Sequence, residues 1–564
     1  MRTHQIRRAT WLLPILLLAT PMLLPLEGRD HAKPSKVEAP QESPEIAGIV
    51  NHIIASENSY NVKLREFSPR VETYVQGFQP DAELGDVAAD DAIFLGRFKA
   101  DKDRKSVKEV SFLQNSSSER FRRSIGMLKA HLNLDVFATE AMTVDEHNFD
   151  RQHYTFEPIR WEYLGDVRCL VMDVNPREPA GEGAFKGRIW VEDHDYAIVR
   201  MNGKRINPPR FGFYVHFDCW RENLQPGLWL PVYIYSQESA LGKSLRFKGQ
   251  TRLWGYDLTA RHQQQEWTNI VINAPAPVQD ATDIASDLSP VEAQRQWTME
   301  AERNVVDRLE KARLIAPPGP VNKVLETVVN NLLATNHLEN LPPVHCRVML
   351  SSTLESFSLA YTIVLSRGLI DVLPDESSLA MVLSHELAHI ALGQKLDTKF
   401  AFNDLLQGAD EDLLASLDIG RNHQDEAAAD AKGIEFLKNS PYKDKLGQVG
   451  LFLEAAAAVA PRVPHLFGSH LGNGLTLGNS KTIRMQALTG GAPALSPTRV
   501  DQIAALPLGS RVQVNPWDGS VAFTTRKAAP PVDASEKMPF RVIPVIPHLR
   551  IYPEPSKAVS SASK

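Results

Sequence analysis

Two histidines and an intervening glutamate carry the clearest chemical signal in the sequence. His385 and His389 are four residues apart, and Glu386 follows the first of them. Asp375 is suited to cap the start of a helix and Gly393 to end it, so the segment between them is predicted to be one helix. Residues four apart share a helix face, so both imidazoles point toward one place, as in a catalytic zinc site. Glu386 is then placed to act as general base on a metal-bound water.

The alternative is a helix that carries two surface histidines. It is disfavoured because two imidazoles and a carboxylate on a buried helix need polar partners or a metal to offset their desolvation. The same helix is otherwise apolar, with Leu379, Met381, Val382, Leu383, Leu387, Ile390 and Leu392. We therefore expect a metal site here.

A catalytic zinc needs a third protein ligand and an open fourth position. The short spacing of the metzincins would place a histidine at position 395, which is Lys395, so that branch is excluded. Glu426 and Asp430 are four apart on a second predicted helix. Glu426 can complete a His/His/Glu set, and Asp430 can accept the outer N–H of a ligating histidine. His423 and Asp425 remain rival ligands.

The motif resembles a known family. His-Glu-Leu-Ala-His at 385–389, followed by Glu-Ala-Ala-Ala-Asp at 426–430, resembles the M48 peptidases, the gluzincins that include the CAAX prenyl protease and HtpX-type proteases. The resemblance extends upstream to Val364–Ile370 and Leu373–Glu376, and it covers roughly residues 300–490.

The resemblance implies a role for each motif residue. His385, His389 and Glu426 would bind one Zn²⁺ per chain, Glu386 would be the catalytic base, and Asp430 would support a ligand from behind. The multiple membrane helices of the prenyl-protease and HtpX branches are missing, so the chain looks like a soluble, envelope-located type.

The resemblance is less complete around the predicted substrate groove. The arm Phe357–Leu365 would be the edge strand along which a peptide adds as an antiparallel strand. The family often has Asn-Ala-Phe where this chain has Glu355-Ser356-Phe357. His470 is the only match to a downstream His-Pro segment, with Arg484 further on. His470 could stabilise the oxyanion or cap the zinc, and a plain structural histidine fits equally well.

The first residues predict export. Arg2, Arg7 and Arg8 precede an apolar run, Trp11–Leu26, which is typical of a secretory signal. Residues 1–29 are therefore expected to be a signal peptide, or a signal anchor if uncleaved, and the protein to act in the periplasm or cell envelope. Contact with a membrane is expected only through this segment.

An antiparallel β-domain is predicted over residues 60–273, after a linker or first helix at 30–59. Gly165-Asp166, Asn202-Gly203 and Gln225–Gly227 read as hairpin turns. The segment from Trp190 to Arg200 resembles the strand, acidic turn and strand of LolA-like half-barrels, against which a generic β-sandwich is the alternative. The predicted strands are Arg168–Val174, Arg188–Val191, Ile198–Met201, Phe213–Trp220, Leu228–Ser236 and Leu245–Leu258.

The remaining chain completes an α+β multidomain fold. A linker at 274–290 precedes a mainly helical gluzincin-type metallopeptidase domain at 291–495, which includes a small β-hairpin of Cys346–Ser351 and Phe357–Leu365. A short β-rich tail follows at 496–564, with a hairpin around 515–519.

Composition limits the partners. The 564 residues carry a net charge of −6, so nucleic acid is not an expected partner. Of three cysteines, Cys169 and Cys219 could pair in an oxidising compartment, and three buried thiols are the alternative.

Taken together, the sequence predicts an exported zinc endopeptidase acting on envelope proteins or peptides. The alternative is an envelope chaperone or lipoprotein- or lipid-sorting factor with a latent or structural zinc site.

Overall fold

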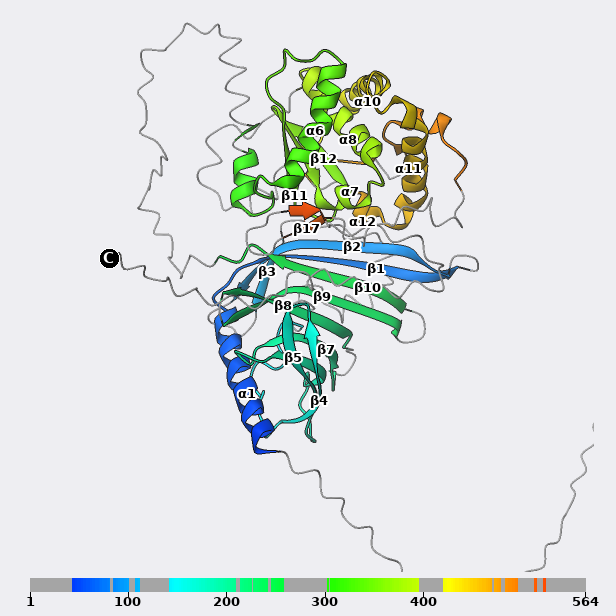
Figure 1. The fold of residues 1–564 in the computed structure, drawn as a ribbon. Coiled ribbons are helices and arrows are strands. Elements are labelled where there is room, and N and C mark those ends of the chain that lie inside the picture. Colours follow the sequence, from blue (N-terminus) through cyan, green and yellow to red (C-terminus); the bar gives the residue numbers. More distant parts are fainter. Residues whose placement is uncertain are drawn as a thin grey trace, which may run out of the picture. The chain divides into compact units, whose positions relative to one another are not determined.

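Ten strands form one antiparallel sheet in the N-terminal part of the chain (Figure 1). The computed structural model describes residues 43–81, 85–100, 107–111, 141–208, 214–225, 227–241, 245–257, 302–303, 305–394, 419–468, 471–477, 482–495, 512–514 and 521–523. The strand order is β3-β2-β1-β10-β9-β8-β7-β6-β5-β4. The bounds are β1 Arg70–Asp81, β2 Gly85–Ala100, β3 Val107–Ser111, β4 Tyr154–Leu164, β5 Val167–Pro176, β6 Phe185–Glu192, β7 Ile198–Arg205, β8 His216–Gln225, β9 Leu228–Leu241 and β10 Leu245–Trp254. The helix α1, Pro44–Leu64, precedes them.

The predicted antiparallel domain is confirmed, with one of its turns misplaced. Asn202-Gly203 lies inside β7 rather than in a hairpin turn. Gly203 pairs with Gly187 of β6, and a Cβ on Gly203 would lie 2.7 Å from the Gly187 Cα. The glycine is needed here for a close approach between two strands, which an isolated reading of the Asn-Gly pair cannot distinguish from a turn.

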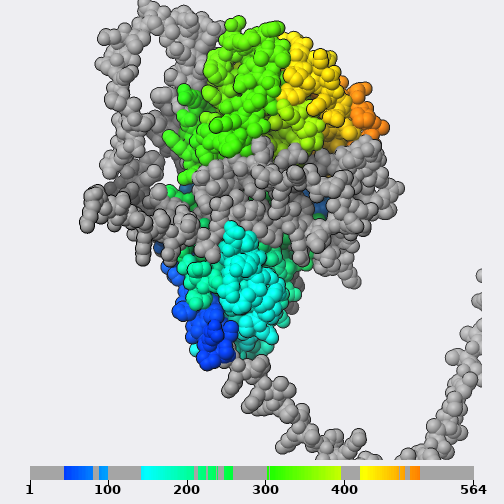
Figure 2. Space-filling model, viewed as in Figure 1, coloured from blue at the N-terminus to red at the C-terminus, as the bar shows by residue number. Residues whose placement is uncertain are grey.

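A four-stranded sheet and a set of helices form the second part. The sheet order is β11-β13-β12-β14, with β11 His345–Met349, β12 Glu355–Leu359, β13 Thr362–Ser366 and β14 Asn473–Gly474. The α-helices include α6 Pro320–Thr335, α7 Arg367–Val372, α8 Glu376–Ala391, α10 His423–Lys438, α11 Leu446–Val459 and α12 Pro464–Phe467. Short 3₁₀ turns lie at Lys443–Lys445, Ala460–Arg462 and Gln486–Gly491. In space-filling form, segments 305–394 and 419–468 pack directly on one another (green to yellow, Figure 2).

The predicted small β-hairpin is present, but its two strands are not the predicted ones. The segment Phe357–Leu365 reverses at Ala360, whose φ is 50°, so it supplies both β12 and β13. β11 then pairs with β13 in parallel. An apolar run does not reveal a turn made by an alanine with positive φ, because few such residues adopt that conformation.

Two small hairpins lie toward the C-terminal end of the described chain. β15 Thr476–Leu477 pairs with β16 Thr482–Ile483, and β17 Val512–Val514 pairs with β18 Val521–Phe523. The second pair confirms the hairpin predicted in the tail. The predicted signal segment at 1–29 and the linker at 274–290 lie outside the described residues. Among the described residues, no helix is long and apolar enough to cross a membrane.

The large sheet and the helical part share polar and apolar contacts. Glu72 of β1 is buried and accepts hydrogen bonds from the backbone N–H and the hydroxyl of Ser352, and it lies 3.3 Å from Arg367 Nη2. Tyr74 and Trp254 belong to the same apolar cluster as the α8 side chains. All three cysteines are free and buried, so a Cys169–Cys219 disulfide is not formed.

Candidate functional site

The predicted helix is present as α8, and its ends are those expected. Asp375 Oδ1 accepts the backbone N–H of Ser378 at 2.8 Å, which caps the start. Gly393 has φ of 64° directly after the end of the helix. Nearly every residue of α8 is buried, including both histidines and Glu386. The helix is therefore an internal element, not a surface one.

A glycine brings α10 close to α8. Asn422 Oδ1 caps α10 by accepting the backbone N–H groups of Gln424 and Asp425. One turn beyond Asp430, a Cβ on Gly433 would lie 3.1 Å from the His385 Cα and backbone nitrogen. Only a residue without a side chain allows this separation, and it sets the distance of Glu426 from the two histidines.

Three side chains that can bind a metal converge between the two helices. The Nε2 atoms of His385 and His389 are 3.1 Å apart. Glu426 Oε2 lies 3.4 Å from His385 Nε2, and Glu426 Oε1 lies 3.3 Å from His389 Nε2. The Nδ1 atoms face outward partners, Asp430 Oδ1 at 2.8 Å and Gln394 Oε1 at 2.6 Å. With both Nδ1 atoms engaged, the Nε2 lone pairs are directed at one point together with the carboxylate.

The donor set fits zinc. Glu386 Oε2 is buried and has no hydrogen-bond donor, whereas Glu426 Oε2 lies 3.2 Å from Arg484 Nη2. A buried carboxylate oxygen without a partner is costly, and a divalent cation among these donors would remove that cost. Two imidazoles and one carboxylate are the ligand types of catalytic zinc sites. The rival ligands stay apart, since His423 is exposed and Asp425 accepts a hydrogen bond from the Asn422 side chain.

Glu386 is held as a carboxylate beside this centre. Its Oε1 accepts the hydroxyl of Ser356 at 2.7 Å and lies 3.5 Å from Arg484 Nη1. Burial alone raises the pKa of Glu386, but the nearby imidazole and Arg484 charges and the Ser356 hydrogen bond hold that pKa below its ordinary value. Burial also raises the pKa of Glu426, but the adjacent imidazoles and the Arg484 charge hold that pKa well below its usual range. The unprotonated form of Glu386 is the one that a general base requires.

Sequence reasoning did not find three of the side chains at the centre. Gln394 holds His389, Ser356 holds Glu386, and the Asn473 amide donates to Glu426 Oε1 at 2.5 Å. Gln394 follows directly after the helix stop, which is the one local signal available for it. Ser356 and Asn473 are brought in by sheet pairing between distant segments. His470 lies outside the described residues.

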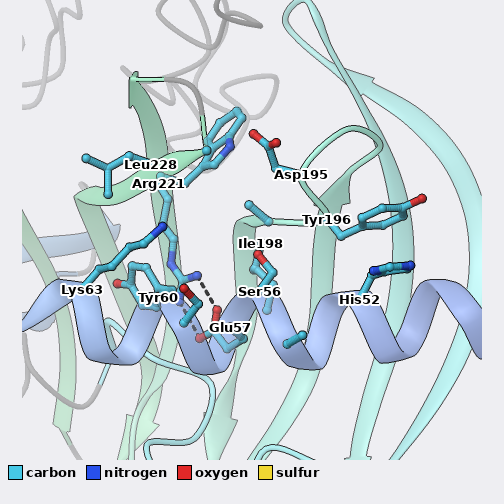
Figure 3. A pocket seen from close by; sticks show the side chains of 15 residues that line it. His52, Ser56, Glu57, Tyr60, Lys63, Asp195, Tyr196, Ile198, Arg221 and Leu228 are labelled. Atoms are coloured by element: carbon cyan, nitrogen blue, oxygen red, sulfur yellow. Dashed lines mark hydrogen bonds and ion pairs between the residues drawn. The ribbon is translucent and has the colours of Figure 1, made fainter.

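Away from the metal centre, a hollow of about 320 Å³ lies in the β-domain between α1 and the turns that precede β7 and β9 (Figure 3). Its floor is a buried ion pair in which both Arg221 Nη atoms donate to Glu57 at 2.6 and 2.8 Å. At its rim, His52 stacks on Tyr196. This site is unrelated to the predicted chemistry and lies on other elements.

Comparison with protein families supports a peptidase activity for this chain. Residues 321–407 match the model of peptidase family M48, a span that includes α8 and ends before α10. At the level of the family, this supports a metallopeptidase, a hydrolase of a kind that is in general zinc-dependent. No curated protein matches the chain.

Two solved structures are similar to part of the chain. The chain is similar to a LolA superfamily protein from Nitrosomonas europaea, with 10% identity and a TM-score of 0.19, over 37% of this chain and 94% of that one. It is also similar to a DUF1329 family protein from Desulfovibrio piger, with 9% identity and a TM-score of 0.21, over 39% of this chain and 95% of that one.

Proposed function

We propose that this protein is an exported zinc endopeptidase that hydrolyses peptide bonds of proteins in the cell envelope. The observation that carries the proposal is the convergence of His385, His389 and Glu426 beside the buried Glu386. Bound zinc would polarise the scissile carbonyl and make a water molecule acidic near neutral pH.

The chain's own residues supply the remaining steps. Glu386 takes the proton of the attacking water and later gives it to the leaving amine, because its carboxylate is adjacent to the ligand set and ionised. Ser356 keeps one oxygen of Glu386 in place, which leaves Oε2 to receive the proton. Asp430 and Gln394 fix the tautomers and ring orientations of the two histidines.

The substrate groove is proposed along β12. Ser356 of this strand is in direct contact with Glu386, so an extended peptide paired with the outer edge of β12 would pass over the reacting groups. Export is proposed from the basic start and the apolar run Trp11–Leu26. Envelope proteins follow as the substrates available there.

Glu386→Gln tests the function. The amide keeps the size of the side chain and all three proposed ligands but cannot accept the proton. Hydrolysis of a denatured protein substrate should fall by about 10²–10⁴-fold with zinc content unchanged. Glu376→Gln, an exposed change at the start of the same helix, is the matched control and should hydrolyse like the wild type. Equal hydrolysis by Glu386→Gln and wild type would overturn the proposal.

A further inference from the structure

The outer edge of β12 is already paired with a strand of the same chain. β14 lies antiparallel to β12, with Asn473 opposite Ser356 and Gly474 opposite Glu355. We call residues Leu471–Leu475 the strap segment. It holds the position beside Ser356 that the proposed function gives to a substrate.

The strap segment is anchored on both sides of β14. Glu355, a buried side chain of β12, accepts the backbone N–H groups of Leu471 and Gly472 at 2.9 and 3.1 Å. The Leu471 carbonyl accepts the N–H of Ile419, and the Leu475 carbonyl accepts the N–H of Arg484, both at 3.0 Å. These contacts use backbone groups, as a peptide of another sequence would.

Asn473 carries the strap segment to the metal centre. Its Nδ2 donates to Glu426 Oε1 at 2.5 Å, and its Oδ1 accepts the backbone N–H of Arg421 at 3.4 Å. Glu386 and the three proposed ligands are all buried. A substrate carbonyl cannot reach these groups along β12 while the strap segment is in place.

At Gly472 the strap segment has no room for a side chain. A Cβ there would lie 2.5 Å from Phe357 Cδ1 and 2.7 Å from the Ser356 carbonyl oxygen. Real Cβ atoms do not approach other atoms this closely, so the ring of Phe357 closes the groove at this register. An occupant of the groove must therefore present glycine opposite Phe357.

We propose that the strap segment is an internal substrate mimic, which closes the groove at rest and is replaced by extended peptides with glycine opposite Phe357. That the strap segment mimics a substrate rests on the proposed function. The pairing of β14 with β12 does not. Closure would keep envelope proteins from being cut until a strand with matching backbone and glycine displaces β14.

Gly472→Ala in the full-length, zinc-loaded protein tests the proposal. The added methyl group should force the strap segment away from β12 without touching a ligand. Zinc loss to a chelator and amide hydrogen exchange in Leu471–Gly474 should rise about ten- to a hundredfold, the order that overpacking gives. Gly490→Ala is the matched control, since a Cβ at Gly490 meets no atom within 4 Å. If Gly472→Ala fails to fold, Asn473→Ala serves, since it removes the link to Glu426 and should accelerate zinc loss.

A synthetic peptide of residues 468–478 tests the glycine requirement. It should bind the Gly472→Ala variant and slow its zinc loss, and the same peptide with valine for glycine at 472 should bind at least about tenfold more weakly. Unchanged zinc loss and exchange in both variants, or equal binding of both peptides, overturns the proposal. Accelerated zinc loss and selective peptide binding without hydrolysis by any variant would uphold the strap segment and refute the peptidase.

Discussion

Gly433→Ala is expected to weaken zinc binding, although alanine is the better helix former. A Cβ at this position lies 3.1 Å from the His385 backbone, closer than ordinary contacts, so α10 must move outward by a few tenths of an ångström. Zinc ligands tolerate deviations of about 0.2 Å. Displacing Glu426 and Asp430 together should therefore cost about 10–100-fold in zinc affinity, or about 1.4–2.7 kcal/mol.

The assay is competition for zinc with a chelator of known affinity, with urea unfolding of the metal-free protein alongside. Ala431→Gly, an exposed exchange on the same helix, is the control. It should lower the free energy of unfolding by about 1 kcal/mol and leave zinc affinity unchanged. If Gly433→Ala binds zinc within a factor of about two of the wild type, the close approach of α10 does not set the ligand geometry.

Three further outcomes are expected. Asp430→Asn should lower zinc affinity about 10–100-fold by chelator competition, and an unchanged affinity would show that the contact with His385 is incidental. Glu57→Gln leaves Arg221 buried without its counter-charge and should lower the free energy of urea unfolding by about 3–5 kcal/mol, whereas a loss below about 1 kcal/mol would count against the pair. Burial alone lowers the pKa of His465, but its hydrogen bond with Asp91 and the carboxylate charge raise that pKa above its ordinary 6.5. His465→Gln should therefore cost more stability in urea unfolding below about pH 6.5 than above the raised pKa, and an equal cost at both would contradict this.

Local patterns were sufficient for the reactive helix. The spacing of His385 and His389, the cap at Asp375 and the stop at Gly393 all act within one segment, so each could be predicted from sequence. The pairing of Glu426 and Asp430 was also visible as a four-residue spacing. The spacing alone does not show that these two side chains face His385, because that depends on how the helices pack. Only the family resemblance indicated this packing.

Contacts between distant segments account for what could not be predicted. Asn202-Gly203 has the composition of a turn, but the register of β6 and β7 places it within a strand. β11 pairs in parallel with β13, which no local signal indicates. The strap segment pairs with β12, which is more than a hundred residues away in the chain, at the strand to which the sequence had assigned a peptide substrate. Sheet register is decided by such long-range pairings.

Zinc-edge X-ray absorption of the purified full-length protein tests the central claim most directly. It should show one zinc per chain with two imidazole nitrogens at about 2.0–2.1 Å and oxygen donors in the remaining positions, and His385→Ala and Glu426→Gln should reduce the metal content. A folded sample without a transition metal, or zinc retained in full by both variants, would contradict the assignment of His385, His389 and Glu426 as the metal centre.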